Sequence, residues 1–196
     1  MSATSALLRL FIAITLPEAI HAAIVPIQQR LERLDTSHAI RWASDDSLHL
    51  TLKFLGETPA DRVEAISAAM QAACKQAPFR LNIEGLGWFP TLRSPRVIWL
   101  GVTGDVPALH HLRDAVERTV APLGFPTEAR PFSPHLTLGR TRQQASKAAL
   151  ASFAEEAGQL PVAQLGSWQV PELVLMRSDL RPSGAVYTVL ARTALS

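Results

Sequence analysis

The chain has 196 residues, of which 47% are hydrophobic and 18% are charged, a composition that supports a packed core and excludes an intrinsically disordered protein. Its formal net charge of +2 excludes a protein that coats nucleic acid through a general positive field, so an anionic ligand must be attracted locally. The single cysteine, Cys74, excludes an intramolecular disulfide and a thiolate zinc cluster.

The first apolar segment, residues 7–14, is short and is interrupted by Arg9. Pro17 and Glu18 follow where an export signal would need small residues at a cleavage site, so the segment predicts a core strand rather than a signal peptide. No stretch approaches the roughly 18 consecutive apolar residues of a membrane span. We therefore expect no membrane association and a cytoplasmic location.

Apolar residues spaced three or four apart predict a helix at residues 20–34. Pro26 lies inside this stripe, and because proline removes an intrahelical hydrogen-bond donor, we expect a kink there or a later helix start. Alternating residues then predict a strand at 48–55 that ends at Gly56.

Thr58 as N-cap and Pro59 in the first turn predict a helix that continues to about Lys75. Cys74 lies on the apolar stripe of this helix, so we expect it to be buried. Periodicity predicts the remaining elements: strands near 80–86 and 96–102, a helix near 107–121, a strand near 133–140, a helix near 143–157, and strands near 163–170, 172–178 and 185–191.

The tetrapeptide His-Leu-Thr-Leu occurs twice, at residues 49–52 and 135–138, and each copy lies in a run of alternating apolar and polar residues. Such alternation predicts a β-strand, on which side chains two residues apart share a face. Each strand therefore carries a histidine and a threonine on one face and leucines on the other. The chain has only six histidines, so two of them in identical tetrapeptides indicate function rather than packing alone.

Two such strands facing one cleft would gather His49, Thr51, His135 and Thr137. Histidine titrates near neutral pH, and hydroxyl groups donate hydrogen bonds to phosphate oxygens. Opening a cyclic phosphodiester needs a base that activates water and an acid that protonates the leaving oxygen, and two imidazoles can supply both. On the residues alone, either histidine can be the acid.

The order of elements is similar on both sides of residue 90, and the two tetrapeptides are 86 residues apart. This pattern predicts an internal duplication with approximate halves 1–90 and 91–196, and an α+β fold of two lobes whose motif strands face each other across a pseudo-twofold axis. Because no Gly-, Ser- or charge-rich linker separates the halves, residues 1–196 should form one compact bilobal domain.

Two signatures in the chain resemble those of the two-histidine (2H) phosphoesterases. The first is Arg41-Trp42 followed by Leu48-His49-Leu50-Thr51-Leu52-Lys53-Phe54-Leu55-Gly56-Glu57, and the second is Pro134-His135-Leu136-Thr137-Leu138-Gly139-Arg140. Within this superfamily the chain is similar to the bacterial and archaeal RNA 2',3'-cyclic phosphodiesterases, once called 2'-5' RNA ligases. The opening residues 9–13 and the closing Leu180, Gly184 and Tyr187 also fit, whereas Gly139 stands where alanine is common.

The resemblance implies that each lobe is an antiparallel sheet with helices outside and that a water-filled catalytic cleft lies between the sheets. It also implies metal-independent hydrolysis of RNA 2',3'-cyclic phosphate ends to 2'-phosphate ends, with His49 as proton donor to the 3' oxygen and His135 as proton acceptor from water. Thr51 and Thr137 are placed to stabilise charge on the phosphoryl oxygens. A near-symmetric pair could also run in reverse and join RNA ends, which would account for the ligase name.

Five further residues are weaker candidates for binding substrate. Lys53 shares strand parity with the first motif, and Arg140 follows the second, so either could reach a phosphate. Phe11, Trp42 and Tyr187 could stack on a base. For each of the five, a surface or packing role is an equally good interpretation.

No metal or other cofactor is expected, because histidine and threonine without carboxylates are poor ligands for a divalent cation. Neither motif strand contains Asp or Glu, and Asp45 and Asp46, just before the first, are typical of a turn. The expected partner is RNA with 2',3'-cyclic phosphate ends, tRNA-derived fragments included, and nothing indicates an obligate protein partner.

Two alternative functions remain open: a phosphodiesterase acting on small cyclic nucleotides, and a non-catalytic module that captures RNA ends. The second alternative is disfavoured because pure binding does not need both histidines.

Overall fold

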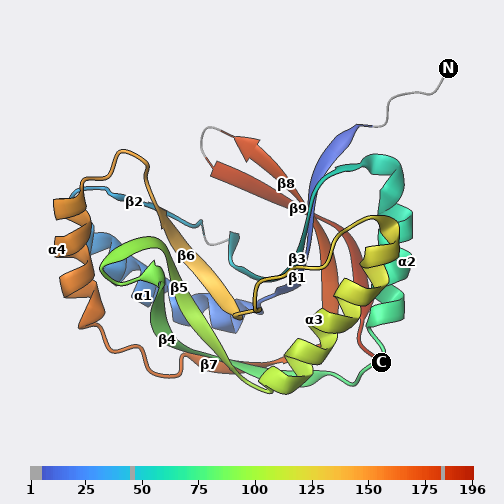
Figure 1. The fold of residues 1–196 in the computed structure, drawn as a ribbon. Coiled ribbons are helices and arrows are strands. Elements are labelled where there is room, and N and C mark those ends of the chain that lie inside the picture. The colour runs from blue at the N-terminus through green and yellow to red at the C-terminus, as the bar shows by residue number, and fades with distance from the viewer. Residues whose placement is uncertain (1–5, 45–46, 182–183) are drawn as a thin grey trace.

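The computed structural model describes residues 6–44, 47–181 and 184–196, which form two antiparallel sheets flanked by α-helices (Figure 1). The first sheet has the strand order β3 (His49–Pro59), β1 (Leu7–Thr15), β8 (Glu172–Arg181), β9 (Gly184–Ala194). The second has the order β2 (Ile40–Trp42), β6 (His135–Thr141), β5 (Ser94–Gly104), β4 (Phe79–Thr91), β7 (Gly166–Val170). The predicted α+β class is confirmed.

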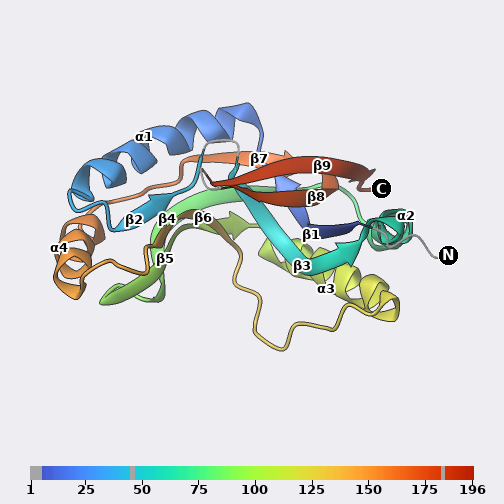
Figure 2. The same ribbon diagram turned by 90° about the horizontal axis from the view of Figure 1, so that it is seen from above.

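The helices flank the sheets in two pairs. Helices α1 (Glu18–Leu34) and α4 (Lys147–Gly158) contact each other and pack on strands β7 and β5 of the second sheet. Helices α2 (Val63–Ala73) and α3 (Val106–Val120) contact each other and pack on strands β9 and β3 of the first sheet. Figures 1 and 2 show the two pairs at opposite ends of the molecule.

The two sheets do not correspond to the predicted halves 1–90 and 91–196, so residue 90 is wrong as a boundary between lobes. Strands β8 and β9 from the C-terminal half complete the sheet of β1 and β3, whereas β4 from the first half lies in the sheet of β5 and β6. The physical reason is the β4–β5 hairpin, whose strands pair through Thr91 and Ser94. A connection of two residues keeps consecutive strands in one sheet.

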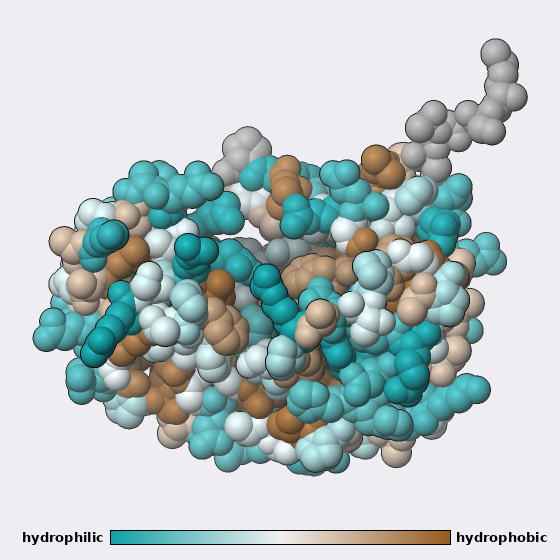
Figure 3. Space-filling view, in the orientation of Figure 1, coloured by the Kyte–Doolittle hydropathy of each residue, from teal (hydrophilic) through white to brown (hydrophobic). Residues whose placement is uncertain are grey.

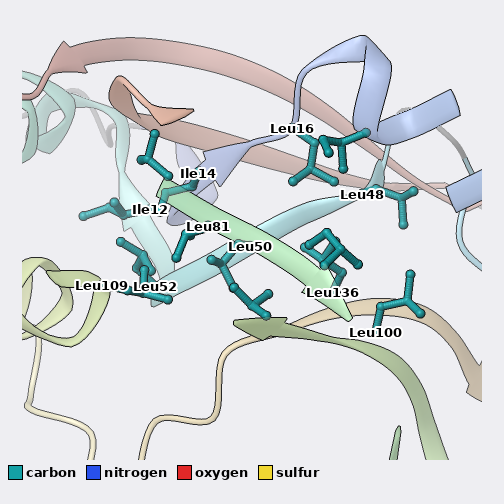
Figure 4. Close-up of a cluster of buried hydrophobic side chains, with 14 of the residues drawn as sticks. Ile12, Ile14, Leu16, Leu48, Leu50, Leu52, Leu81, Leu100, Leu109 and Leu136 are labelled. Atoms are coloured by element: carbon teal, nitrogen blue, oxygen red, sulfur yellow. The ribbon is translucent and has the colours of Figure 1, made fainter. Parts of the chain in front are cut away.

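One apolar core runs beneath both sheets and joins them. Figure 4 shows Leu50 and Leu52 of β3, and Leu48 just before the strand, in one cluster of buried side chains with Leu100 of β5 and Leu136 of β6. Leu50 and Leu136 are both 0% exposed, and strands β3 and β6 are in contact. Cys74, predicted to be buried, is 1% exposed in the same core.

Local signals in two segments are overridden by tertiary packing. Helix α1 begins at Glu18 and includes Pro26, so the later start that Pro26 suggested is wrong. The buried side chains of Ile20, Ile24 and Leu31 anchor the helix on both sides of the proline.

Strand β3 continues to Pro59, although the sequence predicted its end at Gly56 and a helix cap at Thr58. Gly56 has φ +71° and pairs with Leu10 at a shift in register, so glycine lets the strand absorb an irregularity without leaving β1. The helix predicted from Thr58 therefore begins only at Val63, after a short 3-10 turn. No helix in the described part of the chain is both long and apolar enough to cross a membrane.

The exchange of strands predicts that neither half folds alone. Residues 1–91 lack β8, which pairs with β1, and residues 92–196 lack β4, which pairs with β5. Each fragment therefore exposes an unpaired edge and half of the shared core. The intact chain should unfold in one calorimetric transition, and each fragment alone should show little amide dispersion in NMR spectra. A native-like spectrum from either fragment would contradict this prediction.

Candidate active site

His49 lies at the start of β3, where it pairs with Thr15 of β1. Its ring is packed between Phe11, at 4.7 Å between ring centroids, and Tyr187 of β9, at 4.9 Å. Burial lowers the pKa of His49 to about 4, and the backbone of Ser47 opposes the shift only in part. Because burial disfavours the charged ring, the imidazole is neutral at pH 7 in the free protein.

His135 lies at the start of β6 in different surroundings. Its Nδ1 is 2.7 Å from the carbonyl oxygen of Ser133, so the neutral ring carries its hydrogen on Nδ1 and leaves the lone pair on Nε2. Phe89 and Trp99 lie against the ring at centroid distances of 5.0 and 6.1 Å. The pKa of His135 is lowered by burial and by the positive charge of Arg140, against the opposing effect of the Ser133 carbonyl.

Both histidines lie on strand faces opposite the leucines of the shared core. Leu50 and Leu136 belong to the shared core, and each histidine lies one residue from its leucine on the opposite face of its strand. With β3 and β6 in contact, both His-x-Thr faces are therefore directed away from the core. Figure 3 shows the surface hollowed between the two sheets.

Both motif strands contain a β-bulge at the same place. Thr51 pairs with Ala13 and Lys53 with Ile12, so Leu52 is the extra residue in β3. Thr137 pairs with Trp99 and Gly139 with Ile98, so Leu138 is the extra residue in β6. A bulge of one residue reverses the faces of everything that follows. The position after each bulge, Lys53 or Gly139, thus faces the core, and the next position, Phe54 or Arg140, faces the groove.

Lys53 therefore does not line the cleft, and the prediction that it does is wrong. Its side chain is 3% exposed, and Nζ lies 2.8 Å from Oε2 of Glu117 on α3 and donates to the carbonyl oxygen of Pro126 at 2.5 Å. Glu117 also pairs with Arg113 at 3.0 Å. Because Pro126 precedes β6 in the chain, Lys53 joins the strand of His49 to the segment that leads to His135.

Trp42 also faces the core rather than a base, so its predicted stacking role is wrong. It lies edge-on to Phe153 of α4 and pairs with Gly139 across the β2–β6 ladder. A Cβ at residue 139 would lie 2.6 Å from Cγ2 of Ile40 and 2.9 Å from the Trp42 ring. The close approach of these side chains explains why glycine stands in the second signature.

The groove face is the outward side of the two sheets that carries the His-x-Thr pairs. Two of the residues predicted to bind substrate lie on this face, and a third is buried beneath it. Arg140 is exposed, and Tyr187 is half-buried beside His49. Phe11 is 3% exposed, so it supports the His49 ring and offers almost no surface to a base, contrary to the prediction.

Sequence reasoning missed two residues on this face. Phe54 is 59% exposed and lies 6.2 Å from Phe11 between ring centroids. Arg41 is exposed and pairs directly with Arg140 across β2 and β6. Like charges at directly opposed positions repel, and neither arginine has an acidic partner among the described residues. The arginine in the first signature was the signal for this pair, which suits an anionic ligand.

Within the residues that the structure describes, no group of three or more His, Cys, Asp or Glu side chains could hold a metal ion. Asp45 and Asp46, predicted to form a turn, lie outside those residues.

The fold and the paired His-x-Thr strands define a 2H phosphoesterase. A family model described as the 2'-5' RNA ligase superfamily matches residues 17–182, and the chain belongs to this superfamily. A protein of Aeropyrum pernix named RNA 2',3'-cyclic phosphodiesterase is 36% identical over 166 residues, which cover 82% of this chain and 92% of the relative. One of the same name from Methanothermobacter thermautotrophicus is 33% identical over 181 residues, covering 92% and 95%.

Solved structures show the same fold. E. coli LigT complexed with 3'-AMP has a TM-score of 0.76 and 32% identity, and the match covers 97% of this chain and 99% of LigT. The protein TT0787 of Thermus thermophilus has a TM-score of 0.74 and 32% identity, covering 95% and 97%.

Replacing one member of the buried Lys53–Glu117 ion pair should lower the free energy of unfolding more than replacing both. Removing one partner leaves the other charge buried and costs about 3–5 kcal/mol, whereas replacing both by apolar residues is often neutral. Lys53→Met should therefore lower the free energy of unfolding in urea by about 3 kcal/mol or more. Lys53→Met with Glu117→Leu should recover part of the loss, because Arg113 then loses Glu117 but keeps Asp114 as a partner. A single variant as stable as the parent protein would refute this account.

Proposed function

We propose that the protein hydrolyses RNA 2',3'-cyclic phosphate ends to 2'-phosphate ends by two-histidine acid–base catalysis. The observation that carries the proposal is the contact between the two motif strands, β3 and β6, whose leucines share one core while His49, Thr51, His135 and Thr137 occupy the opposite strand faces. Relatives of the chain that are 30% identical or more over most of its length are named RNA 2',3'-cyclic phosphodiesterase, which supports this substrate.

In the proposed reaction a water oxygen attacks phosphorus and the bond from phosphorus to the 3' oxygen breaks. His135 accepts the proton of the water, His49 gives a proton to the 3' oxygen, and the phosphate remains on the 2' oxygen. Thr51 and Thr137 donate hydrogen bonds to the phosphoryl oxygens as charge accumulates there. Arg140, exposed on the groove face, neutralises that charge. The same displacement with a 5' hydroxyl in place of water would break the same bond from phosphorus to the 3' oxygen and form a 2'-5' linkage.

The surroundings of the two imidazoles support this assignment of roles. Burial and the positive charge of Arg140 hold the pKa of His135 down, and because the Nδ1 hydrogen is directed to the Ser133 carbonyl oxygen, Nε2 is the atom left to accept a proton from water. His49 has no such cation among the causes of its lowered pKa, which is due to burial. A phosphate anion at the site compensates for burial, so substrate binding raises the pKa of His49 and lets it carry the proton that the leaving oxygen needs.

Replacing either histidine should abolish turnover without unfolding the protein. We expect His49→Ala and His135→Ala each to reduce hydrolysis by about 10²–10⁴-fold, the usual contribution of a positioned acid or base. The assay uses a short RNA with a 2',3'-cyclic phosphate end in the presence of EDTA and identifies the product end. His111→Ala, an exposed histidine on α3, is the matched control and should be fully active.

Three outcomes would overturn the proposal. Turnover that survives in both histidine variants would refute two-histidine acid–base catalysis. Conversion of small cyclic nucleotides but not of RNA ends would show that the substrates are mononucleotides. Binding of RNA ends without conversion would indicate a capture module.

The pKa assignments predict different pH profiles for free and substrate-bound enzyme. In the free protein the acid His49 has a pKa of about 4, so its protonated fraction, and with it kcat/KM, should fall as pH rises above the mid-acid range. Bound phosphate raises that pKa, so the alkaline limb of kcat should lie at higher pH than that of kcat/KM. Initial rates from the mid-acid to the weakly alkaline range measure both limbs, and limbs that coincide would contradict the assignment.

A further inference from the structure

A groove of about 540 Å³ opens beside His49, and all of its walls come from the first sheet and α1 with the residues that flank them. Leu48, Met176 and Val189 form an apolar floor, Tyr187 stands at the side, and Glu18 and His21 form part of the rim. No residue of the second sheet lines it, so the groove is an annex to the phosphate site rather than the phosphate site itself.

We propose that this annex binds the nucleobase of the RNA's terminal nucleotide and that Glu18 makes it prefer guanine. The inference rests on the proposed function, because the terminal ribose carries both the cyclic phosphate and the base. His49 lines the annex and also belongs to the catalytic pair. In a terminal nucleotide only the ribose separates the cyclic phosphate from the base. A nucleotide whose phosphate lies at His49 can therefore place its base in the annex.

The surface of the annex matches a base better than it matches a phosphate. A nucleobase has apolar faces and a polar edge, and side chains that bind bases combine an aromatic or apolar wall with a few polar groups. The floor and Tyr187 supply the apolar wall. Glu18 has no basic partner among the described residues, so its carboxylate repels phosphate and excludes the RNA backbone from this side.

Helix α1 buries one face in the core and lines the annex with another. Ile20, Ile24 and Leu31 are buried in the core, while Glu18, His21, Ala22 and Val25 line the annex. Residues at spacings of three, four and seven share one helix face, so the carboxylate and the imidazole are neighbours. The small side chain of Ala22 leaves room between them and the sheet.

The chemistry of the rim selects the base. A carboxylate only accepts hydrogen bonds, so it favours an edge with adjacent donors. Guanine presents its imino hydrogen and its amino group side by side, and the neighbouring imidazole of His21 can donate to the guanine O6. Uracil has a single imino hydrogen between two carbonyl oxygens, so a carbonyl oxygen stands where guanine has its amino group, and the carboxylate repels that oxygen. Glu18 therefore favours guanine and disfavours uracil.

The test uses four RNA oligonucleotides that differ only in the terminal base and end in a 2',3'-cyclic phosphate. The parent protein should have a higher kcat/KM for the guanosine end than for the uridine end. Because a paired contact to a base edge discriminates by about tenfold or more, Glu18→Gln should lower the ratio of kcat/KM for guanosine to that for uridine by about tenfold. Glu64→Gln, the same change in the first turn of α2, should leave the ratio unchanged.

A second variant tests occupancy of the annex without touching the catalytic pair. Ala22 is exposed on α1, so Ala22→Phe should fold, fill the annex and raise KM for every end with a smaller effect on kcat. Unchanged KM in this variant, or a guanosine-to-uridine ratio unaffected by Glu18→Gln, overturns the inference while hydrolysis itself stands.

Absence of turnover on all four ends would instead overturn the proposed function. The annex would then be tested by calorimetric titration with guanosine and uridine 3'-monophosphates. Equal binding of the two by the parent protein would refute the inference, and tighter binding of the guanosine compound, lost in Glu18→Gln, would support it.

Discussion

The packing of two leucine faces at the junction of β3 and β6 is the contact on which both fold and site depend. Leu50 and Leu136 have no exposed surface and belong to one core that continues beneath both sheets. Truncating a buried leucine to alanine costs about 2–5 kcal/mol, which is a large part of the stability of an ordinary domain. The same alternation that buries these leucines turns the adjacent histidine and threonine outward, so one packing contact orients both catalytic faces.

The tetrapeptides themselves could be interpreted from sequence because period-two alternation is local. It assigned His49 and Thr51 to one face of the strand and the leucines to the other, and burial of Leu50 and Leu52 agrees with it. The interpretation failed one residue later, at Lys53, because a bulge depends on the register with β1 and Ile12 rather than on the strand's own residues. A second bulge at the matching place in β6 shows that the irregularity belongs to the motif.

The pairing of strands that are distant in the chain could not be predicted from local sequence patterns either. The sequence predicted the existence and type of the C-terminal strands, but not that β8 would pair with β1 across most of the chain. Nor did it separate stacking residues from packing residues, since Phe11, Trp42 and Tyr187 are all isolated aromatics in the sequence. Only the arrangement of the sheets buries Phe11 beneath the His49 ring, sends Trp42 into the core and leaves Tyr187 at the groove.

The histidines of the two identical tetrapeptides differ in the charge beside them, and in the proposed mechanism this difference gives the near-symmetric site a direction. His49 is enclosed by two aromatic rings, which withdraw it from water without adding charge. His135 also lies against two aromatic rings, and the backbone two residues earlier raises the pKa of both histidines, but His135 in addition lies under the influence of the Arg140 guanidinium group. An incoming phosphate anion changes the first environment more than the second, because in the second an arginine already supplies the compensating charge. The two bulges place Arg140 on the outward face of β6 and its counterpart Phe54 on that of β3, where it lies against Phe11. In the proposed mechanism, the different residues at this matching position help to distinguish the acid from the base.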